Sequence, residues 1–116
     1  MLEIQFTKHM RDQQSERDDW LFRIDGLEES IEKDGLLEFK LRNKAIWYFD
    51  EKRTEETGVE SYRCVIKNLV TYCAVKHDNK IIITTTFPHK QSNRGKLNSL
   101  EYIGKFSGLE NQANLS

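Results

Sequence analysis

Residues 58–88 read GVESYRCVIKNLVTYCAVKHDNKIIITTTFP, and this stretch decides the fold. β-Branched and aromatic residues dominate it, which is typical of strands in a sheet. Two turn candidates, Asn68 and the pair Asp78-Asn79, divide it into three pieces of strand length. The last piece begins with almost no polar alternation, so we expect it inside the sheet rather than at an edge. The three expected strands cover residues 59–67, 70–77 and 80–87.

The residues at the N-terminal end predict one strand and two helices. Apolar and polar residues alternate over residues 2–7, which indicates a short strand. Thr7 is a suitable N-cap for a polar helix over residues 8–16. A second helix is expected over residues 19–33, because its apolar residues recur at helical spacing and Gly35 follows as a C-terminal residue.

The segment between these helices and residue 58 predicts two strands and a loop. From residue 36 to 42 apolar residues alternate with charged ones, as in a strand with one buried face. The sequence AIWYFDE, residues 45–51, is expected to form the next strand. The run KRTEETG, residues 52–58, is charged and ends in glycine, so we expect a mobile loop there.

Together these elements predict an α+β fold in which N-terminal helices pack on an antiparallel sheet of four to five strands. A chain of 116 residues is long enough for one domain with its own hydrophobic core. We expect that domain over residues 1–90. The sequence becomes polar after Pro88, so residues 91–116 are expected to form a polar tail, with a short helix as the alternative.

The net charge and the apolar runs of the chain exclude some classes of function. The formal net charge is −1, so contact with RNA requires a local basic patch rather than a global positive field. No apolar run reaches the length of a membrane span, and the first residues lack the pattern of a signal peptide. The sequence therefore predicts a cytoplasmic protein without membrane contact.

The cysteines and histidines predict no metal site and no cofactor. The two cysteines, Cys64 and Cys73, are expected to be reduced, as in cytosolic proteins. A hairpin turn between them would place them directly opposite each other, which keeps a disulfide as the alternative. The spacing of cysteines and histidines matches no zinc motif, and no phosphate-binding loop occurs.

Two short motifs carry a resemblance to a known family. The sequence FTKH occupies residues 6–9, with Gln13 and Arg17 four and eight residues beyond His9, on one face of the expected helix. The last strand of the central block ends in IITTTFP. This pattern resembles the small RelE-like and colicin-D-like nuclease superfamily, in particular its branches from bacteria, phages and mobile elements. The resemblance covers about residues 4–88.

The resemblance implies a metal-independent ribonuclease, in many members a toxin. RNA is the implied substrate, as tRNA, mRNA or RNA on the ribosome, and a cognate antitoxin is an implied protein partner. Catalytic roles are implied for His9, Arg17, and Thr85 or a neighbouring threonine. Such cleavage needs an acid, a base and cations around the phosphate, and a histidine such as His9 is a suitable acid or base because imidazole is the side chain that exchanges protons most readily near neutral pH.

The strand pattern adds candidates for RNA contact. On strand alternation Arg63 and Lys67 share a face, and we expect Arg63 to hold the phosphate together with Arg17. Thr84 and Thr86 are expected on the same exposed face. A solvated surface remains the alternative for each of these residues. The residues expected to bind RNA are Lys8, Arg11, Lys67, Thr84, Thr86, His89 and Lys90.

Two features favour a different function on the same fold. Gln13 stands where related sequences often have arginine, and the chain lacks the strong positive charge of ribosome-dependent toxins. The alternative is a non-enzymatic interaction protein of a phage or mobile element, such as an immunity or accessory protein.

Overall fold

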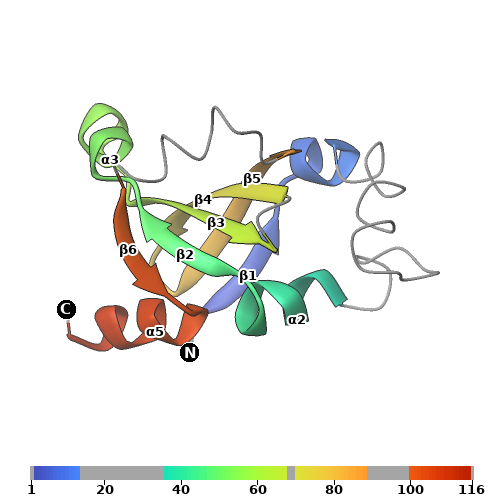
Figure 1. The fold of residues 1–116 in the computed structure, drawn as a ribbon. Coiled ribbons are helices and arrows are strands. Elements are labelled where there is room, and N and C mark those ends of the chain that lie inside the picture. Colours follow the sequence, from blue (N-terminus) through green and yellow to red (C-terminus); the bar gives the residue numbers. More distant parts are fainter. Residues whose placement is uncertain (1, 14–35, 68–69, 89–99, 116) are drawn as a thin grey trace.

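The computed structural model of the chain describes residues 2–13, 36–67, 70–88 and 100–115. Within these residues six strands form one mixed sheet, in the order β1-β5-β4-β3-β2-β6, with helices packed around it (Figure 1). None of the helices in the described ranges is long and apolar enough to cross a membrane. The elements are β1 (Glu3–Phe6), α2 (Leu36–Asn43), β2 (Ile46–Phe49), α3 (Glu51–Thr57), β3 (Ser61–Ile66), β4 (Val70–His77), β5 (Lys80–Pro88), β6 (Glu101–Gly104) and α5 (Phe106–Leu115), and residues 8–13 are also helical.

The central block of the sequence forms the centre of the sheet. The expected hairpin is confirmed as β3 and β4, and β5 lies inside the sheet between β1 and β4. In the β3–β4 register Cys64 lies opposite Tyr72, and Cys73 lies opposite Arg63. The expected pairing of the two cysteines is therefore wrong by one residue, which places them on opposite faces of the sheet. Both cysteines are free.

The strand expected near the N-terminus is confirmed as β1, but it runs parallel to β5, with Ile4 opposite Ile81. The expected antiparallel sheet of four to five strands is therefore corrected to a mixed sheet of six. A parallel partner comes from a distant part of the chain, so a local alternation pattern predicts the strand and not its direction.

Helices replace two elements that the sequence predicts differently. α2 occupies the expected strand over residues 36–42, where Leu37 and Leu41 are buried and Phe39 is exposed. A four-residue spacing fits one helical turn as well as strand alternation. α3 occupies the expected loop over residues 52–58. Its N-cap is Asp50, and Gly58 ends it in the left-handed conformation, with φ of 75°.

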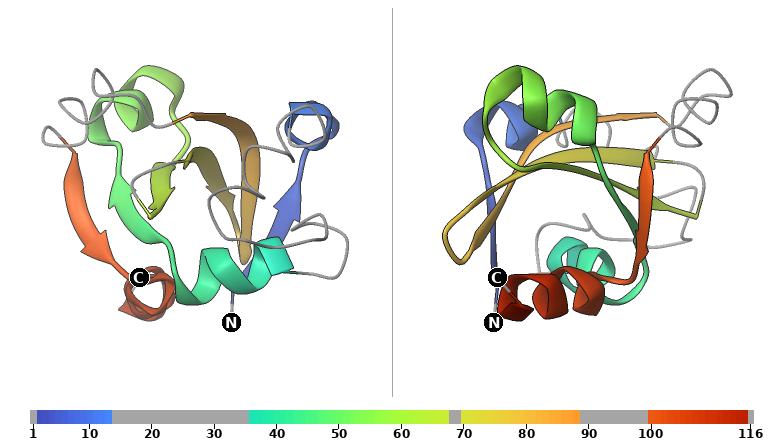
Figure 2. Two further views of the ribbon diagram at one scale, coloured as in Figure 1. Left: turned by 45° about the vertical axis from the view of Figure 1, so that its right-hand side comes forward. Right: turned by 90° about the vertical axis from the view of Figure 1, so that its left-hand side faces the viewer.

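The helices lie on two opposite sides of the sheet and do not form one N-terminal layer. α2 and α5 lie together on one side, whereas α3 and the helical residues 8–13 lie on the other (Figure 2). Residues 8–13 follow the expected N-cap, since the Met10 amide donates to Thr7 Oγ1 at 3.1 Å. The second helix expected from the sequence, over residues 19–33, lies outside the described residues.

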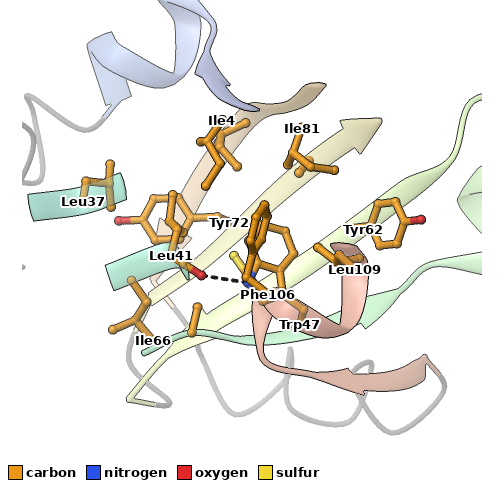
Figure 3. Packing of buried hydrophobic residues seen from close by; sticks show 14 of the residues in the cluster. Ile4, Leu37, Leu41, Trp47, Tyr62, Ile66, Tyr72, Ile81, Phe106 and Leu109 are labelled. Atoms are coloured by element: carbon orange, nitrogen blue, oxygen red, sulfur yellow. Dashed lines mark hydrogen bonds between the residues drawn. The ribbon is translucent and has the colours of Figure 1, made fainter. Parts of the chain in front are cut away.

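The hydrophobic core lies largely between the sheet and the pair α2 and α5 (Figure 3), and it also includes Met10 of the helical residues 8–13. The ring centroids of Trp47 and Phe106 lie 5.4 Å apart, and both side chains are buried. Trp47 Nε1 donates to the carbonyl oxygen of Leu41 at 2.9 Å, which satisfies the indole N–H inside the core. Strand β2, helix α2 and helix α5 are thereby joined at one point.

The C-terminal residues belong to the domain. Residues 101–115, expected within a polar tail over 91–116, form β6 at the edge of the sheet and α5 beneath it. Phe106 and Leu109 of α5 are part of the hydrophobic core. The domain expected over residues 1–90 therefore includes this strand and helix.

Candidate functional site

A cleft of about 560 Å³ opens on the face of the sheet opposite the core. Its floor is a row of paired residues on three adjacent strands, because Cys73 lies opposite Arg63 on one side and opposite Thr85 on the other. Paired residues in neighbouring strands point to the same face. The residues that line the cleft are Thr7, His9, Asp50, Arg53, Tyr62, Arg63, Cys73, Ala74, Val75, Thr84 and Thr85.

A β-bulge in β5 directs two consecutive threonines into the cleft. Cys73 pairs with Thr85 and the next residue of β4 pairs with Ile83, which leaves Thr84 without a partner residue. Thr84 and Thr85 both line the cleft, while Ile83 before them and Thr86 after them are buried. A bulge changes the direction of side chains in this way. The expectation that Thr84 and Thr86 share an exposed face is therefore wrong.

The bulge also positions His9. The Thr7 amide donates to the carbonyl oxygen of Ile83 at 3.1 Å, and Thr7 Oγ1 donates to that of Thr84 at 3.3 Å. The helical residues 8–13 therefore begin beside the bulge. The buried side chain of Met10 anchors this segment in the core, so the start of the helix is fixed at the rim of the cleft with His9 lining it.

Gln13 holds the same helical segment from its other end. Its Oε1 accepts a hydrogen bond from the Thr86 amide at 3.0 Å. Thr86 is buried beneath this contact, and its Oγ1 donates to the carbonyl oxygen of Thr71 at 3.3 Å. Gln13 therefore joins the helix to β5 and does not line the cleft.

The opposite wall of the cleft is the start of α3. Asp50 is only 6% exposed, and its Oδ1 accepts a hydrogen bond from the Arg53 amide at 3.0 Å. Thr54 Oγ1 accepts from the Ser61 amide at 2.9 Å, which attaches α3 to the first residue of β3. Asp50 and Arg53 are thus held beside Arg63, which lies two residues farther along β3.

Arg63 and Asp50 form an ion pair within the cleft. Arg63 Nε lies 3.5 Å from Asp50 Oδ2, and the two side chains are 21% and 8% exposed. Arg63 Nε is buried and makes no hydrogen bond. A buried N–H of a guanidinium that makes no hydrogen bond is stabilised by a nearby negative charge, here the carboxylate of Asp50. The cleft is cationic on balance, because the guanidinium groups of Arg53 and Arg63 outnumber the one carboxylate in its lining.

Cys73 lies in the floor as a protonated thiol. Burial raises the pKa of Cys73, and the nearby guanidinium groups of Arg63 and Arg53 lower it to a smaller extent. A thiol rather than a thiolate is a poor nucleophile. The cleft therefore offers imidazole, guanidinium and hydroxyl groups for chemistry. Among the described residues no group of three or more His, Cys, Asp or Glu side chains is arranged to hold a metal ion.

The structure brings together some of the residues that the sequence singled out. His9, Arg63, Thr84 and Thr85 line one cleft, although they come from opposite ends of the chain. Others lie elsewhere. Lys8 and Arg11 are exposed on the helical residues 8–13, Lys67 is exposed in the turn after β3, and Thr86 is buried. Arg17, His89 and Lys90 lie outside the described residues.

Sequence reasoning missed Asp50 and Arg53. The segment from Asp50 to Gly58 has the signature of a short helix, with aspartate as the N-cap and glycine after the last turn. Reading that signature would have placed Arg53 in the first turn of a helix. The proximity of Asp50 to Arg63 depends on the pairing of β2 with β3, which no local signal indicates.

Comparisons of the chain with protein-family models, with curated proteins and with solved structures find no match. The resemblance to RelE-like and colicin-D-like nucleases therefore rests on the sequence motifs at residues 6–17 and 82–88.

Proposed function

We propose that the cleft binds a phosphodiester of single-stranded RNA and cleaves it by metal-independent acid–base chemistry. The observation that supports this proposal is the presence of His9, Arg63 and two threonine hydroxyls in one cationic cleft. An imidazole beside guanidinium groups is a suitable set of groups for a reaction at a phosphate.

In this proposal His9 acts either as the base that accepts the proton of the attacking 2′-hydroxyl or as the acid that protonates the leaving 5′-oxygen. Arg63 and Arg53 stabilise the negative charge that develops on the phosphate, because guanidinium groups bind phosphate oxygens with paired hydrogen bonds. Asp50 is a positioning residue, since its two oxygens are engaged by the Arg53 amide and by Arg63. Among the described residues Thr85 Oγ1 has no hydrogen-bond partner, so it is available to orient the substrate.

The test is incubation of purified protein with total RNA in EDTA. Loss of the acid or base is expected to lower the cleavage rate by about 10²- to 10⁴-fold in His9→Ala. His77→Ala is the matched control, because His77 is exposed at the end of β4 and does not line the cleft. Equal cleavage by wild type and His9→Ala would contradict the catalytic role.

Arg53→Ala tests the cationic wall. Arg53 and Lys52 are neighbouring exposed residues of α3, but only Arg53 lines the cleft. Arg53→Ala is therefore expected to weaken RNA binding more than Lys52→Ala does. Equal effects of the two substitutions would indicate a diffuse charge effect rather than a site.

The ion pair and Gln13 favour a second candidate, the non-enzymatic interaction protein of a phage or mobile element. Asp50 offsets part of the charge of Arg63, and Gln13 has a structural contact with β5 at a position where the nuclease superfamily that the chain resembles often has arginine. Such a protein would bind its partner without cleaving it. Expression in a bacterial host separates the two candidates, because an active ribonuclease toxin slows growth and its His9→Ala variant does not.

A further inference from the structure

The row of residues in the floor of the cleft continues beyond it onto two more strands. Arg63 lies opposite Tyr48 of β2, and Tyr48 lies opposite Tyr102 of the edge strand β6. Paired residues share a face, so both tyrosines lie on the same face of the sheet as Arg63. Tyr48 and Tyr102 do not line the cleft itself and extend its floor toward the edge of the sheet.

The two rings form an ordered aromatic pair. Their centroids lie 5.8 Å apart at an interplanar angle of 76°, an edge-to-face arrangement. Tyr102 is 67% exposed, although its ring is held in place. Gly104 has φ of 103°, and a Cβ atom there would lie 3.6 Å from the Tyr102 hydroxyl oxygen and 3.7 Å from the ring. The ring therefore rests on bare backbone on one side and on Tyr48 on another.

The position of this pair differs from that of the other large hydrophobic side chain that the described residues expose. Phe39 is 54% exposed on α2, which lies on the side of the sheet that holds the core. Tyr102 instead lies in line with Arg63, and the Cα positions of the two residues are two strand spacings or about 10 Å apart. That separation is comparable with the size of one nucleotide.

We propose that Tyr102, supported by Tyr48, is a stacking subsite for a nucleobase next to the phosphate held at Arg63, and that its ligand is single-stranded RNA. Bases in single strands stack on exposed aromatic rings of sheets, while arginines beside them bind the backbone. A base paired within a duplex cannot present its face in this way. The inference rests on the proposed function, because it assumes that the cleft holds an RNA phosphate.

The test measures binding of a short fluorescein-labelled single-stranded RNA by fluorescence anisotropy, with every variant in a His9→Ala background that prevents cleavage. Tyr102→Ala is expected to raise the Kd by about 5- to 100-fold, the usual effect of removing one stacking ring. Tyr102→Phe should bind as tightly as the background, because it keeps the ring. Tyr102→Leu keeps apolar bulk on the strand and should lose binding as the alanine variant does, which separates stacking from folding.

Phe39→Ala is the matched control and should leave the Kd unchanged. The same RNA in a duplex should bind with a Kd that Tyr102→Ala does not change. Equal Kd values for Tyr102→Ala and the background on the single strand would overturn the inference and point to a protein partner at this edge. Absence of RNA binding by the background protein would also overturn it.

The outcome is separable from that of the proposed function. Cleavage is measured in proteins that retain His9. If these proteins do not cleave RNA but Tyr102→Ala still weakens binding, the stacking subsite is supported and the ribonuclease proposal fails. If they cleave RNA and Tyr102→Ala changes neither KM nor Kd, the ribonuclease proposal stands and the stacking subsite is overturned.

Discussion

Replacement of Asp50 by alanine removes two interactions at one wall of the cleft. Asp50 Oδ1 caps α3 by accepting from the Arg53 amide, and Oδ2 faces the buried Nε of Arg63 at 3.5 Å. The substitution therefore leaves an uncapped helix, and it leaves the buried Nε of Arg63 without its counter-charge. Asp50→Asn keeps a side chain that caps helices well and removes only the charge.

The expected loss follows from these two contributions. Loss of an N-cap costs about 1 kcal/mol. Removal of one partner from a fully buried ion pair costs about 3–5 kcal/mol. The Arg63 side chain is 21% exposed, and we expect solvent to reduce the loss of the pair to about 1–2 kcal/mol. Asp50→Ala should then lower the free energy of unfolding by about 2–3 kcal/mol, and Asp50→Asn by about 1–2 kcal/mol.

Urea unfolding followed by circular dichroism measures both variants, and a double-mutant cycle with Arg63→Met isolates the ion pair. In the Arg63→Met protein, Asp50→Ala should lower the free energy of unfolding only by the contribution of the lost N-cap, because the charged partner of Asp50 is absent. Additive effects of the two substitutions would refute the ion pair as a source of stability. A loss below about 0.5 kcal/mol in Asp50→Ala would refute the cap as well.

Three further predictions concern the fold. Burial and a hydrogen bond from the Tyr62 hydroxyl to Glu60 Oε2, 3.0 Å long, raise the pKa of Tyr62 above its usual value. Above about pH 10 the unfolded state therefore loses the phenolic proton before the folded state does. The free energy of unfolding should then fall by up to about 1.4 kcal/mol per pH unit. Tyr62→Phe should lose less stability than wild type in urea titrations between about pH 9 and about pH 11, and equal losses would contradict the assignment. Gly58→Ala should lower the free energy of unfolding by about 1 kcal/mol, because alanine is strained in the left-handed backbone conformation at this position. The added Cβ meets no atom within 4 Å, so no steric clash adds to this strain. Thermal unfolding measures the loss, and an unchanged Tm would contradict it. In urea unfolding, Phe106→Ala should lower the free energy of unfolding by about 3–5 kcal/mol, because Phe106 is buried. Phe39 is exposed, so Phe39→Ala should lower it by less than about 0.5 kcal/mol. Similarly small losses in both variants would contradict the assignment of α5 to the core.

The sequence predicts the centre of the sheet well and its surroundings poorly. The hairpin of β3 and β4 and the strand β5 follow from β-branched residues separated by turn residues, which are local signals. α2 was misassigned because Leu37 and Leu41 satisfy two periods at once. At α3 the charged composition suggests a loop, while the caps at Asp50 and Gly58 indicate a helix.

The C-terminal elements carry a weak signal in the sequence. Phe106 and Leu109 lie one helical turn apart and are both buried, but two apolar side chains at this spacing are a weak helix signal. β6 is four residues long and pairs at the sheet edge. Such short elements gain their stability from tertiary packing, which local composition does not report.

The sequence predicts those site residues that their side-chain chemistry identifies. It does not predict the residues whose direction depends on how the strands pair. His9, Arg63 and Thr85 were singled out by their chemistry, and the fold brings them to one cleft. The three consecutive threonines give no sign of the bulge, so strand alternation places Thr86 on the exposed face although it is buried. A one-residue bulge reverses the faces of every later residue in a strand.

The parallel pairing of β1 with β5 has a consequence for how the chain folds. β1 is synthesised before β5, so Ile4 finds its partner Ile81 only after β5 has left the ribosome. In the same way Trp47 reaches Phe106 only near the C-terminal end of the chain. Native contacts of such large sequence separation slow folding, because loop closure must precede them. We therefore expect β1 and Trp47 to lack these native partners until late in synthesis, when an unpaired strand edge and an apolar ring favour aggregation.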